Sequence, residues 1–529
     1  MLNKVLLLGD EAVALGAINA GLSGIYAYPG TPSTEITEFI QENPLARERN
    51  IHSRWSTNEK TAMEEALGMS FAGKRAMVCM KHVGMNVCAD AFVNSAITGI
   101  NGGLVVVAAD DPSMHSSQNE QDSRFYGKFA MVPVLEPSNQ QECYDMAAYA
   151  FDLSERLKLP VLMRLVTRVA HSRASVVTGP LRNQNDLSPE SDSRHWVLLP
   201  GIARWQYASL VEKQTLVASL SEESAFNRYE PSYSRLGVIA CGIAYNYVME
   251  LGVKNVLKVS QYPLPVSAIE KMARGCDRIL VVEDGQPVVE QEVKALLGAG
   301  FKVEGRLTGV LPRTGELTPD SVAAALGLKS EPAYAPAENV APRPPQLCNG
   351  CSHRDVYTAL VKVLEDYPQA RVFGDIGCYT LGALPPFKAL DSTVDMGASI
   401  TMAKGAADAG IYPAVAVIGD STFTHSGMTG LLDAVNENAD ITVIISDNLT
   451  TAMTGGQESA GTSKFENICK GLGVDPAHLK VVLPIPKAMD EIMEVIRKEI
   501  EYHGVSVIIP RRECMNTLNR RLRKQKAGK

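Results

Sequence analysis

The fold of this chain is decided by residues 417–457, VIGDSTFTHSGMTGLLDAVNENADITVIISDNLTTAMTGGQ. An apolar run ends in Gly419-Asp420, a helix-length stretch follows, and the next apolar run ends in Asp447-Asn448. Continuous apolar runs separated by a helix predict neighbouring parallel strands that are buried on both faces. The polar ends of these two strands should therefore lie side by side at one edge of the sheet.

This pair of strand ends carries oxygen ligands for a hard cation. The carboxylate of Asp420 and the amide oxygen of Asn448 suit Mg²⁺, which proteins usually bind together with the phosphates of a ligand. The small Ser421 lets a diphosphate approach the free N–H groups of the following helix. Taken alone, Asp420 could be only a helix cap, but the polar end of the adjacent strand favours a magnesium–diphosphate site.

The same alternation of apolar runs and helix-length amphipathic stretches continues through most of the chain. It predicts an α/β fold whose parallel sheets are covered by helices on both faces. Several runs end in a carboxylate followed by a helix, which is typical of the ligand-binding edge of such sheets. The apolar runs are 104–110, 160–166, 236–242, 278–284, 413–420 and 441–448.

Two breaks interrupt this alternation and divide the chain. Residues 181–232 are more polar and lose the alternation, which indicates a connecting segment, and residues 330–346 are rich in Pro and Ala, which indicates an extended linker. Three α/β units are therefore expected, at 1–180, 233–329 and 347–529. The length of 529 residues agrees, because it corresponds to about three domains of ordinary size.

The composition excludes several classes of protein. A net charge of −8 disfavours a nucleic-acid-binding protein, and no stretch is long and apolar enough to cross a membrane. The N-terminal MLNKVLLLGDEAVA does not suit a secretory signal, because acidic residues follow its short apolar run directly. Ten Cys in a chain of this length do not form a disulfide scaffold. A cytoplasmic enzyme with reduced thiols is expected.

Two cysteines, Cys348 and Cys351, form a CxxC pair in LCNGCSHRDVY directly after the Pro-rich segment. Such a pair can belong to a zinc site, a thiol–disulfide couple or an iron–sulfur cluster. A self-contained Cys₄ zinc site would need a second close pair, which the sequence lacks. Cys378 and Cys514 follow two predicted strands, so these four thiolates could meet as the usual ligand set of a [4Fe–4S] cluster. The remaining six fit helix or strand patterns and are interpreted as structural: Cys79, Cys88, Cys143, Cys241, Cys276 and Cys469.

The spacing from Gly419-Asp420-Ser421 to Asn448 resembles the diphosphate signature of thiamine diphosphate enzymes. The resemblance implies that Asp420, the side chain of Asn448 and the backbone carbonyl of Thr450 ligate Mg²⁺. It also implies cofactor contacts for Gly419 and Ser421, with Thr451 and Thr454 as additional ones.

Enzymes of this kind use a Glu that hydrogen-bonds the aminopyrimidine ring of the cofactor, placed where a helix of small residues begins. The segment STNEKTAMEEALGMSFAG, residues 56–73, is similar to that pattern, with Glu59 as the implied carboxylate. Glu64 and Glu65 compete with Glu59 for this role. All three could instead be solvated helix charges.

Across nearly its whole length the chain resembles the 2-oxoacid:ferredoxin oxidoreductases, most closely the α subunits of those that oxidise indolepyruvate. Long motifs carry the resemblance and occur in the order of the family. They are AYPGTPSTEI (27–36), MKHVGMNVCAD (80–90), PVLMRLVTRVAHSR (160–173), CNGCSHR (348–354), GDIGCYTLG (374–382) and DNLTTAMTGGQ (447–457).

This resemblance implies a catalytic subunit for oxidative decarboxylation of aryl 2-oxoacids, of the indolepyruvate or phenylpyruvate type, to arylacetyl-CoA. Thiamine diphosphate, Mg²⁺ and a [4Fe–4S] cluster would be the cofactors, coenzyme A the co-substrate, and ferredoxin the electron acceptor. A smaller β subunit would make the enzyme a hetero-oligomer. By the same resemblance residues 1–180 bind the pyrimidine, 347–529 bind the diphosphate and Mg²⁺, and 233–329 resemble the C-terminal domain of transketolase-like enzymes.

Two further residues match positions that line the active site of this family. Thr31, in the turn YPGTPS, could direct its hydroxyl at a ligand, with a helix N-cap at Thr31 or Ser33 as the alternative. His82 follows Lys81 and could donate a proton or contact the substrate, since imidazole titrates near neutrality. A purely structural His82 is the alternative.

Relatives commonly continue into a ferredoxin-like module with two Cys-rich motifs. This chain ends at Lys529 without one, so electrons are expected to leave from the single cluster to ferredoxin or a partner. Two rival functions stay open: a non-redox thiamine diphosphate decarboxylase or synthase with inert cysteines, and a non-catalytic scaffold subunit.

Overall fold

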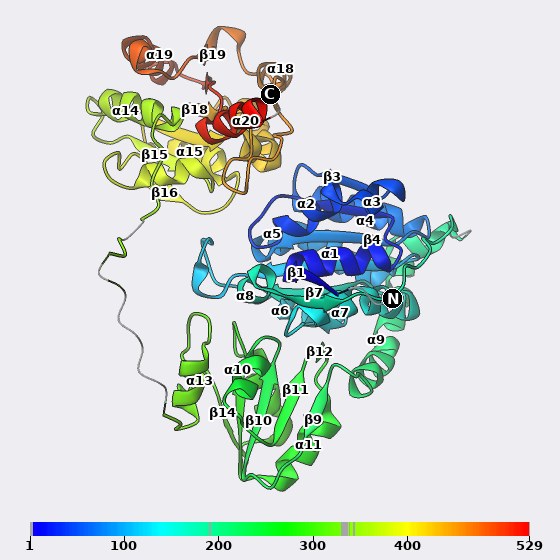
Figure 1. Cartoon of the computed structure of the whole chain (residues 1–529). Helices are drawn as coiled ribbons and strands as arrows, with labels where there is room; N and C mark the ends of the chain where they lie inside the picture. The colour runs from blue at the N-terminus through cyan, green and yellow to red at the C-terminus, as the bar shows by residue number, and fades with distance from the viewer. Residues whose placement is uncertain (1–3, 190–191, 330–336, 338, 342–343, 528–529) are drawn as a thin grey trace. The chain divides into compact units, whose positions relative to one another are not determined.

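The computed structural model describes residues 4–189, 192–329, 337, 339–341 and 344–527. The chain forms two compact units, Met1–Tyr334 and Ala335–Lys529 (Figure 1). Much of the segment expected to be a linker, 330–346, lies outside the described residues. No helix in the described part of the chain is long and apolar enough to cross a membrane.

The first sheet of the N-terminal unit has seven strands, and all neighbours in it are parallel except the edge pair β12–β6. Helices that contact one another and the sheet fall into two groups, one with α1, α2 and α7 and one with α4 and α5. The strands in order are β12 (Gln261–Tyr262), β6 (Val134–Leu135), β7 (Val161–Val166), β5 (Leu104–Asp110), β4 (Ala76–Lys81), β2 (Gly24–Ala27) and β3 (His52–Trp55). The helices are α1 (Gly9–Asn19), α2 (Thr34–Glu42), α4 (Glu59–Phe71), α5 (His82–Thr98) and α7 (Gln140–Leu157).

Shorter elements complete this part of the unit. The N-terminal apolar run forms β1 (Lys4–Leu8), which pairs antiparallel with β8 (Arg173–Val177) in a separate two-stranded sheet. The short helices are α3 (Pro44–Glu48), α6 (Arg124–Ala130) and α8 (Thr167–His171). The stretch 181–232, where no regular element was predicted, contains the long helix α9 (Pro200–Glu222).

The second sheet of this unit has five strands, all parallel to their neighbours except the edge strand β9, which is antiparallel. The strands in order are β14 (Lys302–Glu304), β13 (Arg278–Val282), β10 (Leu236–Cys241), β11 (Val256–Val259) and β9 (Arg228–Glu230). Its helices are α10 (Ala244–Glu250), α11 (Val266–Gly275), α12 (Val288–Leu297) and α13 (Pro319–Ala325).

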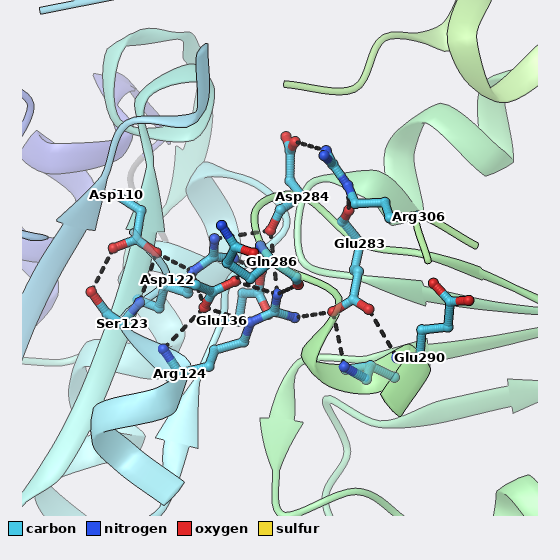
Figure 2. A network of polar contacts seen from close by, with 12 residues as sticks. Asp110, Asp122, Ser123, Arg124, Glu136, Glu283, Asp284, Gln286, Glu290 and Arg306 are labelled. Atoms are coloured by element: carbon cyan, nitrogen blue, oxygen red, sulfur yellow. Dashed lines mark hydrogen bonds and ion pairs between the residues drawn. The ribbon is translucent and has the colours of Figure 1, made fainter. Parts of the chain in front are cut away.

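A buried network of ion pairs joins these two sheets, as Figure 2 shows. Arg124 forms an ion pair with Asp122 at 2.6 Å, close to it in the sequence, and with Glu283 at 2.9 Å, which follows β13 of the five-stranded sheet. Burial alone would raise the pKa of Asp122, but the adjacent Arg124 and Arg164 lower it to about 2. Arg164 likewise pairs with Asp110 at 2.5 Å and donates to the backbone oxygen of Asp284. Each buried charge therefore has a partner, which makes the two sheets of this unit interdependent.

The C-terminal unit is a single six-stranded sheet in which every neighbouring pair is parallel. The strands in order are β16 (Ser392–Thr393), β15 (Arg371–Gly374), β17 (Ala414–Gly419), β18 (Ile441–Ser446), β20 (Val505–Pro510) and β19 (Leu479–Val482). The longer helices are α14 (Ser352–Leu364), α15 (Ala398–Asp408), α17 (Met428–Asn436), α19 (Met489–Ile500) and α20 (Met515–Ala527), with the short α18 (Phe465–Gly471) between them.

Both faces of this sheet are buried. Ala416 and Ile418 of β17 belong to one hydrophobic core, whereas Val415 and Val417 belong to another, as the two-residue period of a strand requires. The first core takes apolar side chains from α15 and α17, and the second from α14 and α19. The predicted α/β class with parallel sheets covered by helices is thus confirmed, and all six apolar runs named above contain strands.

We expect Arg124→Met to destabilise the N-terminal unit by about 3–5 kcal/mol, because it leaves Glu283 buried without its cation and Asp122 with Arg164 alone. Lys128→Met is the matched control, since Lys128 on the same helix forms an exposed pair with Glu292 that is worth less than about 1 kcal/mol. Amide hydrogen exchange in β5 and β13 measures the difference. Equal protection in both variants would contradict the role given to the network.

Candidate functional site

The carboxyl ends of β17 and β18 bring the two predicted metal ligands together. The strands pair in register with Gly419 opposite Ser446, so Asp420 and Asn448 leave the same edge. The carboxylate of Asp420 accepts hydrogen bonds from the backbone N–H groups of Ser421 (2.8 Å) and Thr450 (3.1 Å). The same Thr450 N–H lies 3.2 Å from Oδ1 of Asn448. Asp420, Asn448 and the Thr450 backbone therefore form one compact group.

Electrostatics at Asp420 favour a cation. Burial raises the pKa of Asp420 to about 7 although Ser421 donates a hydrogen bond to its carboxylate. The neighbouring Arg511 is engaged elsewhere, because it pairs with Asp447 at 2.6 Å and Glu466 at 2.7 Å. Among the described residues Asp420 forms no ion pair, so the donor set fits an oxygen-seeking divalent cation.

The threonines of the loop after β18 differ in their surroundings. Thr451 donates its hydroxyl to Oγ of Ser421 at 3.0 Å, so it lies at the start of the segment that follows β17. The hydroxyl of Thr454 instead donates to Oε1 of Gln457 at 2.6 Å and closes the loop on itself. Ser421 and Thr451 are thus close together, whereas the Thr454 hydroxyl is occupied within its own loop.

The four cysteines singled out in the sequence line one cavity of about 70 Å³. Cys351 precedes α14 as its N-cap residue, Cys378 follows β15, and Cys514 follows β20. Burial, and after it the proximity of the other three thiols of the group, raises the pKa of Cys378 to about 12. The sulfur atoms therefore interact electrostatically, as expected of thiols that share one site. The remaining six cysteines are buried.

This cavity adjoins the strand-end group directly. Asn448 lines it together with the cysteines. The backbone oxygen of Asn448 also accepts a hydrogen bond from the N–H of Cys514 at 3.1 Å. One residue thus belongs to both sites.

Two residues of this region were not identified from the sequence. His353 is buried beside the cysteines, its Nε2 lies 3.5 Å from Nδ2 of Asn448, and burial lowers its pKa to about 4. Asp375 follows β15, accepts hydrogen bonds from N (2.7 Å) and Oγ (2.5 Å) of Ser399, and has its pKa raised to about 7 by burial. The Gly374-Asp375 pair repeats the Gly419-Asp420 pattern on the adjacent strand, which is the signal that could have revealed Asp375.

In the N-terminal unit, Glu59 stands apart from its two competitors. It opens α4, whose N-cap is Asn58, and only 5% of it is exposed, whereas Glu64 and Glu65 are exposed. Gly84 of α5 leaves the space that the Glu59 side chain occupies, since a Cβ there would lie 2.8 Å from Oε1 of Glu59. A buried carboxylate in a shaped recess is suited to a specific hydrogen bond with a ligand.

Thr31 and His82 lie at the same carboxyl edge of the seven-stranded sheet, after β2 and β4. Of the two N-cap alternatives, Ser33 holds the N-cap position of α2, although its side chain makes no capping hydrogen bond. His82 is buried, with Nε2 3.1 Å from Oδ1 of Asn119 and with Nδ1 lacking a hydrogen-bond partner among the described residues. Burial lowers the pKa of the adjacent Lys81 to about 8. The edge therefore combines a hydroxyl, an imidazole and a buried amine.

Comparison with known proteins identifies relatives for both units. Residues 15–198 match the family model described as pyruvate flavodoxin/ferredoxin oxidoreductase, thiamine diphosphate-binding, and residues 375–509 match the C-terminal domain of thiamine pyrophosphate enzymes. Indolepyruvate oxidoreductase subunit IorA of Pyrococcus abyssi is 40% identical over 97% of this chain and 86% of its own length. The subunit of the same name from Archaeoglobus fulgidus is 39% identical over 99% and 88%.

A solved structure of a 2-oxoacid oxidoreductase is similar to this chain in fold. The 2-oxoglutarate:ferredoxin oxidoreductase of Magnetococcus marinus aligns with a TM-score of 0.51 at 15% identity, covering 62% of this chain and 65% of that one. At this identity the match concerns the fold alone.

We expect Gly84→Ala to destabilise the chain by about 1–3 kcal/mol, because a Cβ there would lie 2.6 Å from Cγ of Glu59 and 2.9 Å from Cβ of Met80. Gly68→Ala on the preceding helix is the matched control, since its Cβ would meet nothing within 4 Å and the change should stabilise by about 0.5–1 kcal/mol. Both substitutions gain the same helix propensity, so their difference reports the crowding. Thermal unfolding measures it, and equal midpoints for the two variants would argue against the recess.

Proposed function

Since the chain belongs to the family of indolepyruvate oxidoreductase subunit IorA, we propose that it is the catalytic subunit for oxidative decarboxylation of aryl 2-oxoacids to arylacetyl-CoA, with electrons passing to ferredoxin. One observation carries the proposal. Asn448 belongs both to the Asp420 group and to the cavity that the four cysteines line. A cofactor held at Asp420 would thus be close to an electron acceptor held by the same chain.

The cofactors of this proposal are thiamine diphosphate, Mg²⁺ and a [4Fe–4S] cluster. When bound, thiamine diphosphate supplies the carbon nucleophile of the decarboxylation, Mg²⁺ neutralises its diphosphate, and the cluster accepts single electrons. Asp420, Asn448 and the Thr450 carbonyl would hold the Mg²⁺. The desolvated carboxylate of Asp420 supports this role, because a bound cation would keep it ionised.

Glu59 would hydrogen-bond the aminopyrimidine ring of the cofactor. Its burial and its recess at Gly84 support this role over Glu64 and Glu65, which are exposed to solvent. Thr31 and His82, at the same sheet edge, would contact the 2-oxoacid. Coenzyme A, ferredoxin and a smaller β subunit complete the proposed assembly.

Two of the four cysteines are unsuited to act as free nucleophiles, which favours a metal site or inert thiols. Burial raises the pKa values of Cys351 and Cys378, so these thiols would be protonated and poor nucleophiles in the absence of a metal. Iron would displace those protons, as metals do at coordinating thiols. The non-redox alternative predicts instead that the four cysteines bind nothing.

We expect Cys514→Ala to lose the cluster iron and the brown colour of the anaerobically purified protein, because one of four thiolate ligands is removed. Cys469→Ala is the matched control, since Cys469 lies buried in the core between α15, α17 and the sheet, away from the cavity. Iron content and visible absorbance measure the effect, and circular dichroism verifies that both variants fold. A wild-type protein without iron would support the non-redox alternative.

The reaction itself is tested by anaerobic co-expression with a candidate β subunit, followed by viologen reduction with a panel of 2-oxoacids and coenzyme A. We expect indolepyruvate or phenylpyruvate to exceed pyruvate and 2-oxoglutarate. Glu59→Gln should lower turnover by about 100-fold or more, whereas Glu64→Gln, an exposed change on the same helix, should not. Strong preference for pyruvate would overturn the aryl assignment, and near-normal turnover of Glu59→Gln would overturn the role of that residue.

A further inference from the structure

A second cavity, of about 250 Å³, lies in the N-terminal unit away from the proposed site. It is lined by the end of α5 and the loop before β5, by Lys158 just after α7, and by residues of the 3₁₀ turn Ser193–Trp196 and of helix α9. The residues that carry its chemistry are Lys158, His195, Trp196, Trp205, Gln206 and Lys213.

This cavity is at the opposite edge of the seven-stranded sheet from Glu59 and His82. Residues 96–101, at the end of α5 and in the loop after it, precede β5, and Lys158 precedes β7, whereas Glu59 and His82 follow β3 and β4. Because these strands run parallel, their two ends define separate edges. A ligand in this cavity would therefore not be a reactant at Glu59.

The charge of the cavity is positive and unbalanced. Lys158 and Lys213 both line it, and no Asp or Glu is among the described residues that do. Among the described residues, Lys158 donates to the backbone oxygen of Asn101, at 2.8 Å, and neither Lys158 nor Lys213 forms an ion pair. Burial lowers the pKa of Lys213, and the like charge of Lys158 lowers it further. An anion bound between the two amines would stabilise the charge of Lys213 against both its burial and its repulsion from Lys158.

Aromatic rings form another part of the wall. Trp196 stacks on Phe71 with ring centroids 3.8 Å apart. Trp205 lies nearly parallel to His195, with centroids 6.0 Å apart and an interplanar angle of 18°, and 59% of Trp205 is exposed. Because the Trp205 ring is largely exposed beside the cavity, it could stack against a planar ligand.

A buried acceptor is unused in the same wall. Gln206 is only 5% exposed, and its Nε2 donates to the backbone oxygen of His195. Its Oε1 is buried and has no hydrogen-bond partner among the described residues. Because an unpaired buried acceptor is costly, a ligand that donates a hydrogen bond here would be favoured.

We propose that this cavity is a binding site for a small anion that carries a planar ring with a hydrogen-bond donor. The anionic group would lie between Lys158 and Lys213, the ring against Trp205, and the donor at Oε1 of Gln206. Two kinds of molecule share this chemistry, a nucleoside monophosphate and an indole acid. Either would bind as something other than a reactant at Glu59, because the cavity is on the other edge of the sheet from that residue.

The test is isothermal titration calorimetry of the full-length chain with AMP and, separately, with indole-3-acetate. We expect saturable binding of at least one probe, and a loss of affinity of about tenfold in Lys213→Gln, because one of the two cations is removed. Arg204→Gln is the matched control: Arg204 is an exposed cation on the same helix that does not line this cavity. Its affinity should equal that of the wild type.

The outcomes separate the sources of the ligand. Binding of AMP alone identifies a nucleotide site, binding of indole-3-acetate alone identifies an indole-acid site, and binding of both supports the shared chemistry. The proposal would be overturned if neither probe binds, or if Lys213→Gln and Arg204→Gln lose the same affinity. None of these readouts depends on turnover, so they stand apart from the test of the proposed function.

Discussion

Burial of both faces of the C-terminal sheet is the constraint on which the rest of this unit depends. The side chains of β17 alternate between two hydrophobic cores, so neither face can present polar groups to a ligand. A ligand can therefore meet polar groups only at an edge of the sheet, and Asp420 and Asn448 lie at the carboxyl edge. The same burial raises the pKa of Asp420 to about 7, a desolvation that is tolerable where a cation binds. The apolar sheet thus both locates the site and determines what it can hold.

The two sheets of the N-terminal unit show two different uses of the same edge. At the seven-stranded sheet, Glu59 and His82 follow their strands into buried positions that suit a ligand. At the five-stranded sheet, Glu283 and Asp284 follow β13 but are taken up by ion pairs with Arg124 and Arg306 (Figure 2). A carboxylate at the end of a parallel strand is therefore no proof of a ligand site, because a buried arginine can neutralise it, from helix α6 for Glu283 and from the segment after β14 for Asp284.

The features that could be predicted from the sequence are those that depend on a local pattern of residues. Apolar runs of strand length identified the parallel strands, and the Gly419-Asp420 and Asn448 spacing identified the adjacent strand ends. The antiparallel edge strand β9 and helix α9 were not predicted, because the first is three residues long and the second lies in a polar stretch. His353 was missed for a different reason. Its burial beside Asn448 arises from tertiary packing, which spacing along the chain does not encode.

The meeting of the four cysteines shows how sheet order converts distant residues into one site. Cys378 follows β15 and Cys514 follows β20, and the order β15-β17-β18-β20 separates these strands by three spacings, about 14 Å. The segments after both strands must therefore bend inward over the ends of β17 and β18. The hydrogen bond from Cys514 N–H to the Asn448 backbone oxygen fixes one of these bends. Cys351 reaches the same cavity from the start of α14, which Val356 and Leu360 anchor in the second core. Packing of one helix and the order of four strands thus bring the cysteines to the residue that completes the Asp420 group.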